Sequence, residues 1–134
     1  MKFISPKLHG ALDYSVASVL IGTPLVLRFS DVSVAAAIIA IAAGSGLVVY
    51  SLLTAYSAGV RAVIPFRVHL VLDASAAVAL LAVPFLFGFG GTPRAFYLVI
   101  GAAVLAVVAC TRVQEESGRS EAPLHFTTRD FLAR

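Results

Sequence analysis

Four long apolar stretches decide what this chain can fold into. Lone charged residues delimit them at residues 8–27, 32–60, 68–93 and 95–111. Each stretch is long enough, or can be trimmed, to supply the roughly 20 mainly apolar residues of a transmembrane helix. Only 13% of the 134 residues are charged and 60% are hydrophobic, whereas about a quarter of the residues in a soluble domain carry charge. The chain is therefore predicted to be an integral membrane protein.

The predicted fold is all-α, an integral-membrane four-helix bundle that occupies residues 1–112. We expect its transmembrane helices at about residues 6–28, 32–55, 66–88 and 94–112. A polar tail at residues 113–134 follows and is predicted to be cytoplasmic. Cys110 is the single cysteine, so neither a disulfide nor a thiolate metal cluster can form within one chain.

The distribution of Lys and Arg predicts the orientation of the spans. Cytoplasmic loops of membrane proteins carry an excess of these residues. Lys2, Lys7, Arg61, Arg67 and Arg112 fall on the side of the N-terminus, against Arg28 and Arg94 on the other side. Both termini are therefore predicted to be cytoplasmic. The formal charge of +3 suits anionic lipid headgroups, and because no basic patch is interleaved with aromatics, no nucleic-acid partner is expected.

The sequence contains an internal repeat, in which residues of the first half match residues of the second half. At an offset of 60 the matched pairs are His9 and His69, Leu12 and Leu72, Asp13 and Asp73, Ser15 and Ser75, Ala17 and Ala77, Leu20 and Leu80, Pro24 and Pro84, and Phe29 and Phe89. At an offset of 57, Gly44 matches Gly101 and Thr54 matches Thr111. We therefore expect two helical-hairpin repeats, at about residues 5–57 and 65–112. A unit that crosses the membrane twice is repeated in the same direction, so both His–Asp pairs should lie on the cytoplasmic side at one depth.

Pro24 and Pro84 lie late in the first and third predicted helices. Proline inside a helix removes a backbone hydrogen bond to the carbonyl four residues earlier and commonly kinks the helix. We therefore predict a helix kink at each of these residues.

The repeated pair of His and Asp is the candidate site. Residues four apart share a helix face, and an ionisable side chain in a membrane span is costly and usually faces the bundle interior. In one interpretation, each pair is satisfied within itself or by Lys7, Tyr14 or Arg67, and holds the hairpins together. In another, His9, Asp13, His69 and Asp73 converge on a divalent metal such as Zn, Mn or Fe.

Two further interpretations of this pair stay open. The two His residues could be axial ligands of a haem. Asp and His within spans are also typical of proton relays, which here would require proton or ion conduction through an oligomer, because the far halves of the spans lack ionisable groups. Besides the lipid bilayer, further copies of the chain or a larger membrane complex are the partners that a protein this small suggests.

Enzymatic chemistry has little support in the sequence. It contains no glycine-rich phosphate loop, zinc-protease helix or nucleophile elbow. Ser15 and Ser75 follow the Asp residues by two positions and fall on a different helix face, which is poor geometry for a catalytic triad. We expect a non-enzymatic protein with a structural or binding role.

Two segments of the chain are similar to a known family. Residues 4–14, ISPKLHGALDY, and residues 64–69, IPFRVH, resemble segments of the SPW-repeat type of small bacterial membrane proteins. The resemblance covers roughly residues 3–112 and implies two hairpin repeats in a bacterial inner membrane, without implying an activity. The Ser-Pro-Trp motif of that family is replaced here by Thr23-Pro24-Leu25 and Val83-Pro84-Phe85, and the chain has no Trp.

Overall fold

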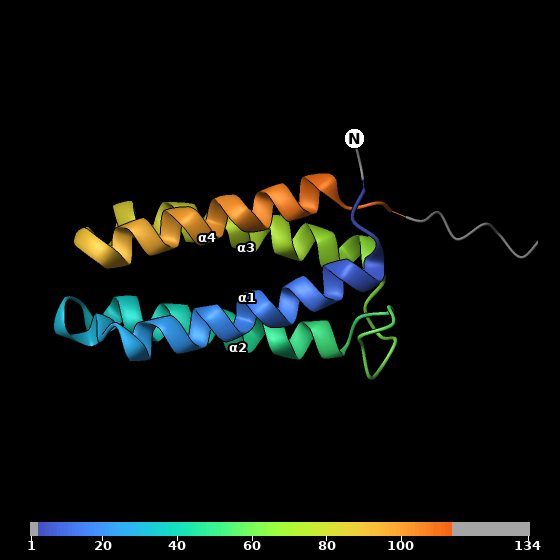
Figure 1. Ribbon diagram of the computed structural model, residues 1–134, viewed down its shortest axis with the longest axis horizontal. Coiled ribbons are helices and arrows are strands. Elements are labelled where there is room, and N and C mark those ends of the chain that lie inside the picture. Colours follow the sequence, from blue (N-terminus) through green and yellow to red (C-terminus); the bar gives the residue numbers. More distant parts are fainter. Residues whose placement is uncertain (1–2, 114–134) are drawn as a thin grey trace, which may run out of the picture.

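Two antiparallel helical hairpins lie side by side in the computed structural model, which describes residues 3–113 (Figure 1). The first hairpin consists of α1 (Pro6–Val26) and α2 (Val34–Leu52), joined through a short 3-10 turn, η1 (Phe29–Asp31). The second consists of α3 (Phe66–Leu86) and α4 (Gly91–Cys110). The predicted all-helical bundle is therefore confirmed for the described residues. The polar tail that we predicted lies, apart from residue 113, outside them.

Three of the helices, α2, α3 and α4, are long and apolar enough to cross a membrane. The first predicted span, α1, is as long as α3, at 21 residues. It is less apolar because Gly10, Tyr14 and Ser18 stand where α3 has Leu70, Ala74 and Val78. Large apolar side chains point outward from the helices. Their exposed fractions include 41% for Val19, 62% for Leu25, 61% for Ile38, 58% for Val49, 64% for Val71 and 65% for Val99. Such an exterior indicates contact with lipid.

The helix ends differ from the predicted ends by a few residues. α1 begins as expected, with the Ser5 hydroxyl accepting a hydrogen bond from the Leu8 amide at 3.3 Å and Pro6 at the first helical position. α1 and α3 both end two residues early, because Arg28 and Gly88 adopt left-handed backbone angles, with φ of 48° and 66°. α4 begins three residues early, at Gly91, since Pro93 is tolerated in a first turn.

Small residues let the two helices of each hairpin approach closely. A Cβ added to Gly44 of α2 would lie 2.9 Å from the carbonyl oxygen of Ala17 in α1. A Cβ added to Gly101 of α4 would lie 3.0 Å from the carbonyl oxygen of Ala77 in α3. The matched pairs of the sequence thus make matched contacts, and the same helix faces are buried in both hairpins.

Short backbone pairings place the helix ends beside one another at the end of the bundle that carries the N-terminus (Figure 1). Ile4, just before α1, forms a parallel bridge with Thr111, just after α4. Ile64, just before α3, forms the same bridge with Thr54, just after α2. The beginning of α1 is therefore held against the end of α4, which belongs to the other hairpin.

Aromatic residues join the hairpins at the opposite end. The Tyr97 ring is fully buried, and its hydroxyl donates to the carbonyl oxygen of Ala36 at 2.8 Å. Phe29 and Phe96 pack edge to face, with ring centroids 5.2 Å apart. Pro24 and Pro84 are buried nearby, two residues before the ends of α1 and α3, and the kink at each of them stays a prediction.

The close approach at Gly44 and Gly101 is testable. We expect Gly44→Ala and Gly101→Ala each to lower the free energy of unfolding by about 1–3 kcal/mol, because the added methyl group overpacks the helix interface. Gly22→Ala is the matched control. Nothing lies within 4 Å of a Cβ added at Gly22, so the change should be neutral or stabilise α1 by up to about 1 kcal/mol. Denaturant unfolding in bicelles gives these values, and equal effects at all three glycines would contradict the packing.

Candidate functional site

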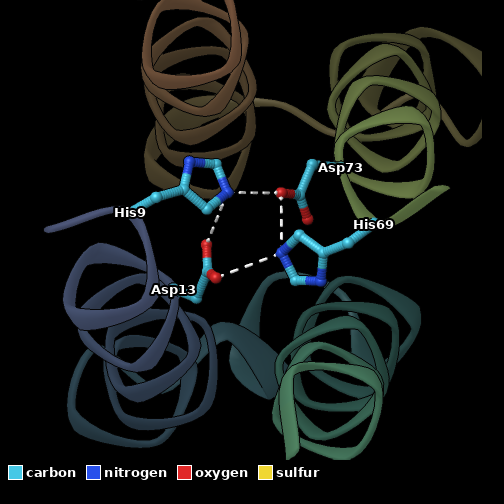
Figure 2. Close-up of side chains that lie close together, drawn as sticks. All are labelled: His9, Asp13, His69 and Asp73. Carbon is cyan, nitrogen blue, oxygen red and sulfur yellow. Dashed lines mark hydrogen bonds and ion pairs between the residues drawn. The ribbon is translucent and has the colours of Figure 1, made fainter. Parts of the chain in front are cut away.

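His9, Asp13, His69 and Asp73 meet on the axis between the hairpins, two from α1 and two from α3 (Figure 2). The two His residues are 0% exposed, and Asp13 and Asp73 are 5% and 2% exposed. One nitrogen or oxygen atom from each residue lies within 4.8 Å of those of the other three. We call these four residues the His–Asp cluster. The predicted convergence of the two repeated pairs is therefore present in the structure.

Both His residues of the cluster contact the carboxylate of the other hairpin. His9 Nε2 lies 2.9 Å from Asp73 Oδ2, and His69 Nε2 lies 3.1 Å from Asp13 Oδ2. The pairs within one helix are also in contact, at 3.1 Å between His69 Nε2 and Asp73 Oδ2 and at 3.4 Å between His9 Nε2 and Asp13 Oδ1. Each imidazole therefore directs Nε2 at both carboxylates, and the pairs are not satisfied within their own helices alone.

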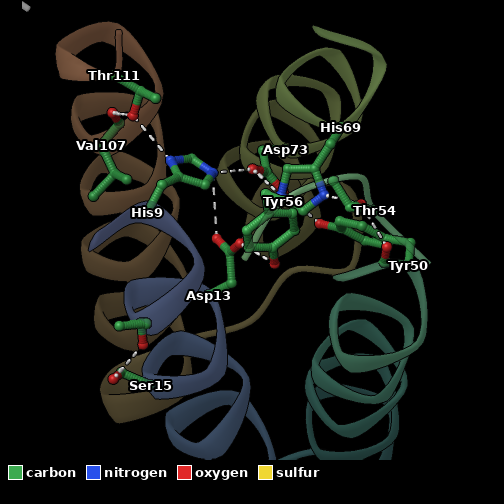
Figure 3. Close-up of polar contacts among 11 residues, drawn as sticks. His9, Asp13, Ser15, Tyr50, Thr54, Tyr56, His69, Asp73, Val107 and Thr111 are labelled. Atoms are coloured by element: carbon green, nitrogen blue, oxygen red, sulfur yellow. Dashed lines mark hydrogen bonds and ion pairs between the residues drawn. The ribbon is translucent and has the colours of Figure 1, made fainter. Parts of the chain in front are cut away.

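Two threonines determine which imidazole nitrogen carries a proton (Figure 3). Thr111 Oγ1 donates to the carbonyl oxygen of Val107 at 2.6 Å and lies 2.9 Å from His9 Nδ1. Thr54 Oγ1 donates to the carbonyl oxygen of Tyr50 at 2.7 Å and lies 2.8 Å from His69 Nδ1. Since each hydroxyl proton is already used, each Oγ1 must accept from an Nδ1–H group. Both Nδ1 atoms are therefore protonated.

This arrangement explains the pairing of Thr54 with Thr111 in the sequence. Each threonine follows the last helix of one hairpin and contacts the His of the other hairpin, because the backbone bridges hold these chain ends together. The alignment of the two residues was visible in the sequence. Their hydrogen bonds to His were not predicted, because the exchange between hairpins is a tertiary property.

Two tyrosines of the first hairpin and its following loop donate to the carboxylates. Tyr50 Oη donates to Asp73 Oδ1 at 2.6 Å, and Tyr56 Oη donates to Asp13 Oδ2 at 3.0 Å. Burial raises the pKa of Tyr56 well above its usual range, so its phenol remains a donor at neutral pH. Neither tyrosine was predicted as a site residue, because neither is repeated. Their counterparts at an offset of 57 are Val107 and Val113.

The other polar residues proposed for the site lie elsewhere. Lys7 and Arg67 are exposed and line a surface hollow together with Tyr56 and Phe66. Tyr14 Oη donates to the carbonyl oxygen of Ala58 at 3.0 Å. The side chains that hydrogen-bond to the His–Asp cluster are instead those of Thr54, Thr111, Tyr50 and Tyr56.

The charges in the cluster limit the species that it can contain. Two carboxylates with two neutral imidazoles leave a charge of −2 in a buried site, which is strongly unfavourable. Two imidazolium ions or one divalent cation would balance this charge. A haem fits less well than an ion, because carboxylate oxygens lie within 3.4 Å of both Nε2 atoms, where the porphyrin plane would have to pass.

Comparison with known proteins adds no functional information, since no protein-family model, curated protein or solved structure matches this chain. The geometry of the site is therefore the basis for the proposed function.

Replacing Thr111 with the isosteric Val tests the proton assignment. The change should leave a buried Nδ1–H of His9 without an acceptor and lower the free energy of unfolding by about 1–3 kcal/mol. Thr54→Val should act alike through His69. The control is Ser15→Ala, because the exposed Ser15 hydroxyl bonds only its own helix, at the Ala11 carbonyl. Loss of less than about 0.5 kcal/mol in both threonine variants would contradict the assignment.

Proposed function

We propose that this protein binds one divalent transition-metal ion at the His–Asp cluster and that the ion ties its two hairpins together. The observation that carries the proposal is the direction of the imidazoles. Both Nδ1 atoms are committed as donors to threonine, so both Nε2 atoms face the carboxylates. An uncharged imidazole would point its Nε2 lone pair at carboxylate oxygen, which is repulsive unless a cation lies between them.

The spacing of the ligand atoms supports an ion of ordinary size. Metal–nitrogen and metal–oxygen bonds of about 2.0–2.2 Å place neighbouring ligand atoms roughly 3.0–3.5 Å apart in tetrahedral or octahedral geometry. The N···O contacts made by Asp13 Oδ2 and Asp73 Oδ2, one oxygen from each carboxylate, span 2.9 to 3.1 Å. Two imidazoles and two carboxylates suit Zn, Mn or Fe.

The surroundings of the imidazoles also resemble those of metal ligands. Metal-bound His almost always donates its other N–H to a fixed acceptor, which sets the tautomer and the ring orientation. Thr54 and Thr111 have this role, and each is held in turn by a backbone carbonyl. The proposed role is structural and binding, in that a divalent ion neutralises two buried carboxylates. No enzymatic role is proposed.

Elemental analysis of protein purified in mild detergent without chelators tests this proposal. We expect one Zn, Mn or Fe per chain in the unmodified protein and none in His9→Ala with His69→Ala. Thr111→Val should weaken binding by roughly 10- to 100-fold, as expected for a residue that orients a ligand. Asp31→Asn is the control, since Asp31 is exposed in η1 at the other end of the bundle, and it should retain the full metal content.

A different result would favour the purely structural interpretation. If the unmodified protein contains less than about 0.1 metal ion per chain and takes up none from Zn²⁺, Mn²⁺ or Fe²⁺ under anaerobic conditions, the metal proposal is wrong. The cluster would then consist of imidazolium–carboxylate pairs that join the hairpins, and loss of stability in the double His variant would be its sole consequence.

We also propose that all four helices span a bacterial inner membrane with both termini in the cytoplasm. α1 matches α3 in length, and its later turns expose Val19 and Leu25 as the other helices expose their apolar residues. The N-terminal end of the bundle carries Lys7, Arg61 and Arg67. The predicted relationship to SPW-repeat proteins is consistent with this location, and that relationship stays a prediction.

Cysteine labelling tests this topology. Ser30→Cys, in the exposed turn after α1, should react with a membrane-impermeant maleimide added to intact spheroplasts. Ser57→Cys, in the loop after α2, should react only after lysis. The unmodified chain, with Cys110 in α4, is the control for background labelling. Labelling of Ser57→Cys from outside would reverse the orientation, and equal access at both positions would contradict a span at α2, the helix that separates them.

A further inference from the structure

A cavity of about 250 Å³ lies between the two hairpins beside the His–Asp cluster. His9, Asp13, Asp73 and Tyr50 line it. Apolar side chains from all four helices form the rest of its wall, among them Leu12, Val16, Leu47, Leu80, Val104 and Val107. An apolar cavity of this size can hold an organic molecule.

The cavity coincides with the point at which the two halves of the molecule differ. Tyr50 and Val107 occupy equivalent positions, since each carbonyl accepts the hydroxyl of the threonine that holds a His ring (Figure 3). In one half the Tyr50 ring packs edge-on against His69, with centroids 5.1 Å apart, and its hydroxyl donates to Asp73 Oδ1 at 2.6 Å. In the other half a valine replaces that phenol.

The second half nevertheless contains the residues that would surround a phenol at this position. His9 and Asp13, the counterparts of His69 and Asp73, line the cavity together with Val107. Asp13 Oδ1 lies 3.4 Å from His9 Nε2, the longest contact in the cluster, whereas Asp73 Oδ1 accepts the short bond from Tyr50. Asp13 is also the most exposed of the four cluster residues. An acceptor and an imidazole thus border a space beside the small side chain of Val107.

We propose that this cavity binds a membrane-soluble phenol of the hydroquinone class. The phenol ring packs against His9, its hydroxyl donates to Asp13 Oδ1 as Tyr50 donates to Asp73, and an alkyl substituent lies among the leucines and valines. The apolar wall and the lipid-facing exterior select a ligand that arrives from the bilayer. Metal binding needs one oxygen from each carboxylate, so the two sites are compatible and this proposal does not depend on the metal.

Equilibrium binding of a decyl-substituted hydroquinone tests the proposal. Protein in nanodiscs is incubated anaerobically with the probe, and the excess retained over protein-free nanodiscs gives the probe bound per chain. We expect saturation at one per chain. The dimethyl ether of the same probe cannot donate, so it should bind roughly 10- to 150-fold more weakly, as loss of a hydrogen bond to a charged group predicts.

Val107→Tyr provides a second test in the protein itself. The new side chain should fill the cavity, donate to Asp13 and abolish saturable binding of the hydroquinone. Val99→Tyr, on the exposed face of the same helix, is the matched control and should bind as the unmodified protein does. Equal binding of hydroquinone and ether would overturn the proposal in favour of a lipid acyl chain, and this comparison needs no variant. Unchanged binding in a folded Val107→Tyr variant would place the ligand elsewhere and also overturn it.

Discussion

The structure depends on the exchange of imidazole–carboxylate contacts between two hairpins. Each His contacts the Asp of the other hairpin, at 2.9 Å for His9 and 3.1 Å for His69, and donates to the threonine at the end of the other hairpin. A separate hairpin would therefore expose buried polar groups to lipid, where unsatisfied groups are costly. The exchange makes the two halves one unit, although each half is packed internally through its own glycine contact.

The interior of the bundle is not packed uniformly along its length. The hairpins are joined by the His–Asp cluster at one end and by the aromatic residues around Tyr97 at the other. Between these ends, Val107 takes the place that Tyr50 has in the first half, and a cavity lies beside the cluster. The proposed ion site and the proposed ligand cavity thus adjoin each other through Asp13.

Much of the fold follows from short-range patterns. Apolar length located the helices, and the matched His and Asp residues indicated which faces of α1 and α3 are buried. The partners inside the cluster could not be read from these patterns, since helical spacing suggests His9 with Asp13 whereas the tighter contact is His9 with Asp73. Tyr50 and Tyr56 were not predicted because the second half has no matching tyrosines, and the site residues were identified from residues that both halves share.

X-ray absorption at the metal edge tests the central claim most directly, because it observes the ligands themselves. Two imidazole nitrogens and two carboxylate oxygens at about 2.0–2.2 Å should surround the bound ion, and His9→Ala with His69→Ala, which should bind no metal, should give no metal edge above background. A first shell composed only of oxygen, a sulfur ligand, or a spectrum unchanged in the double variant would contradict the account.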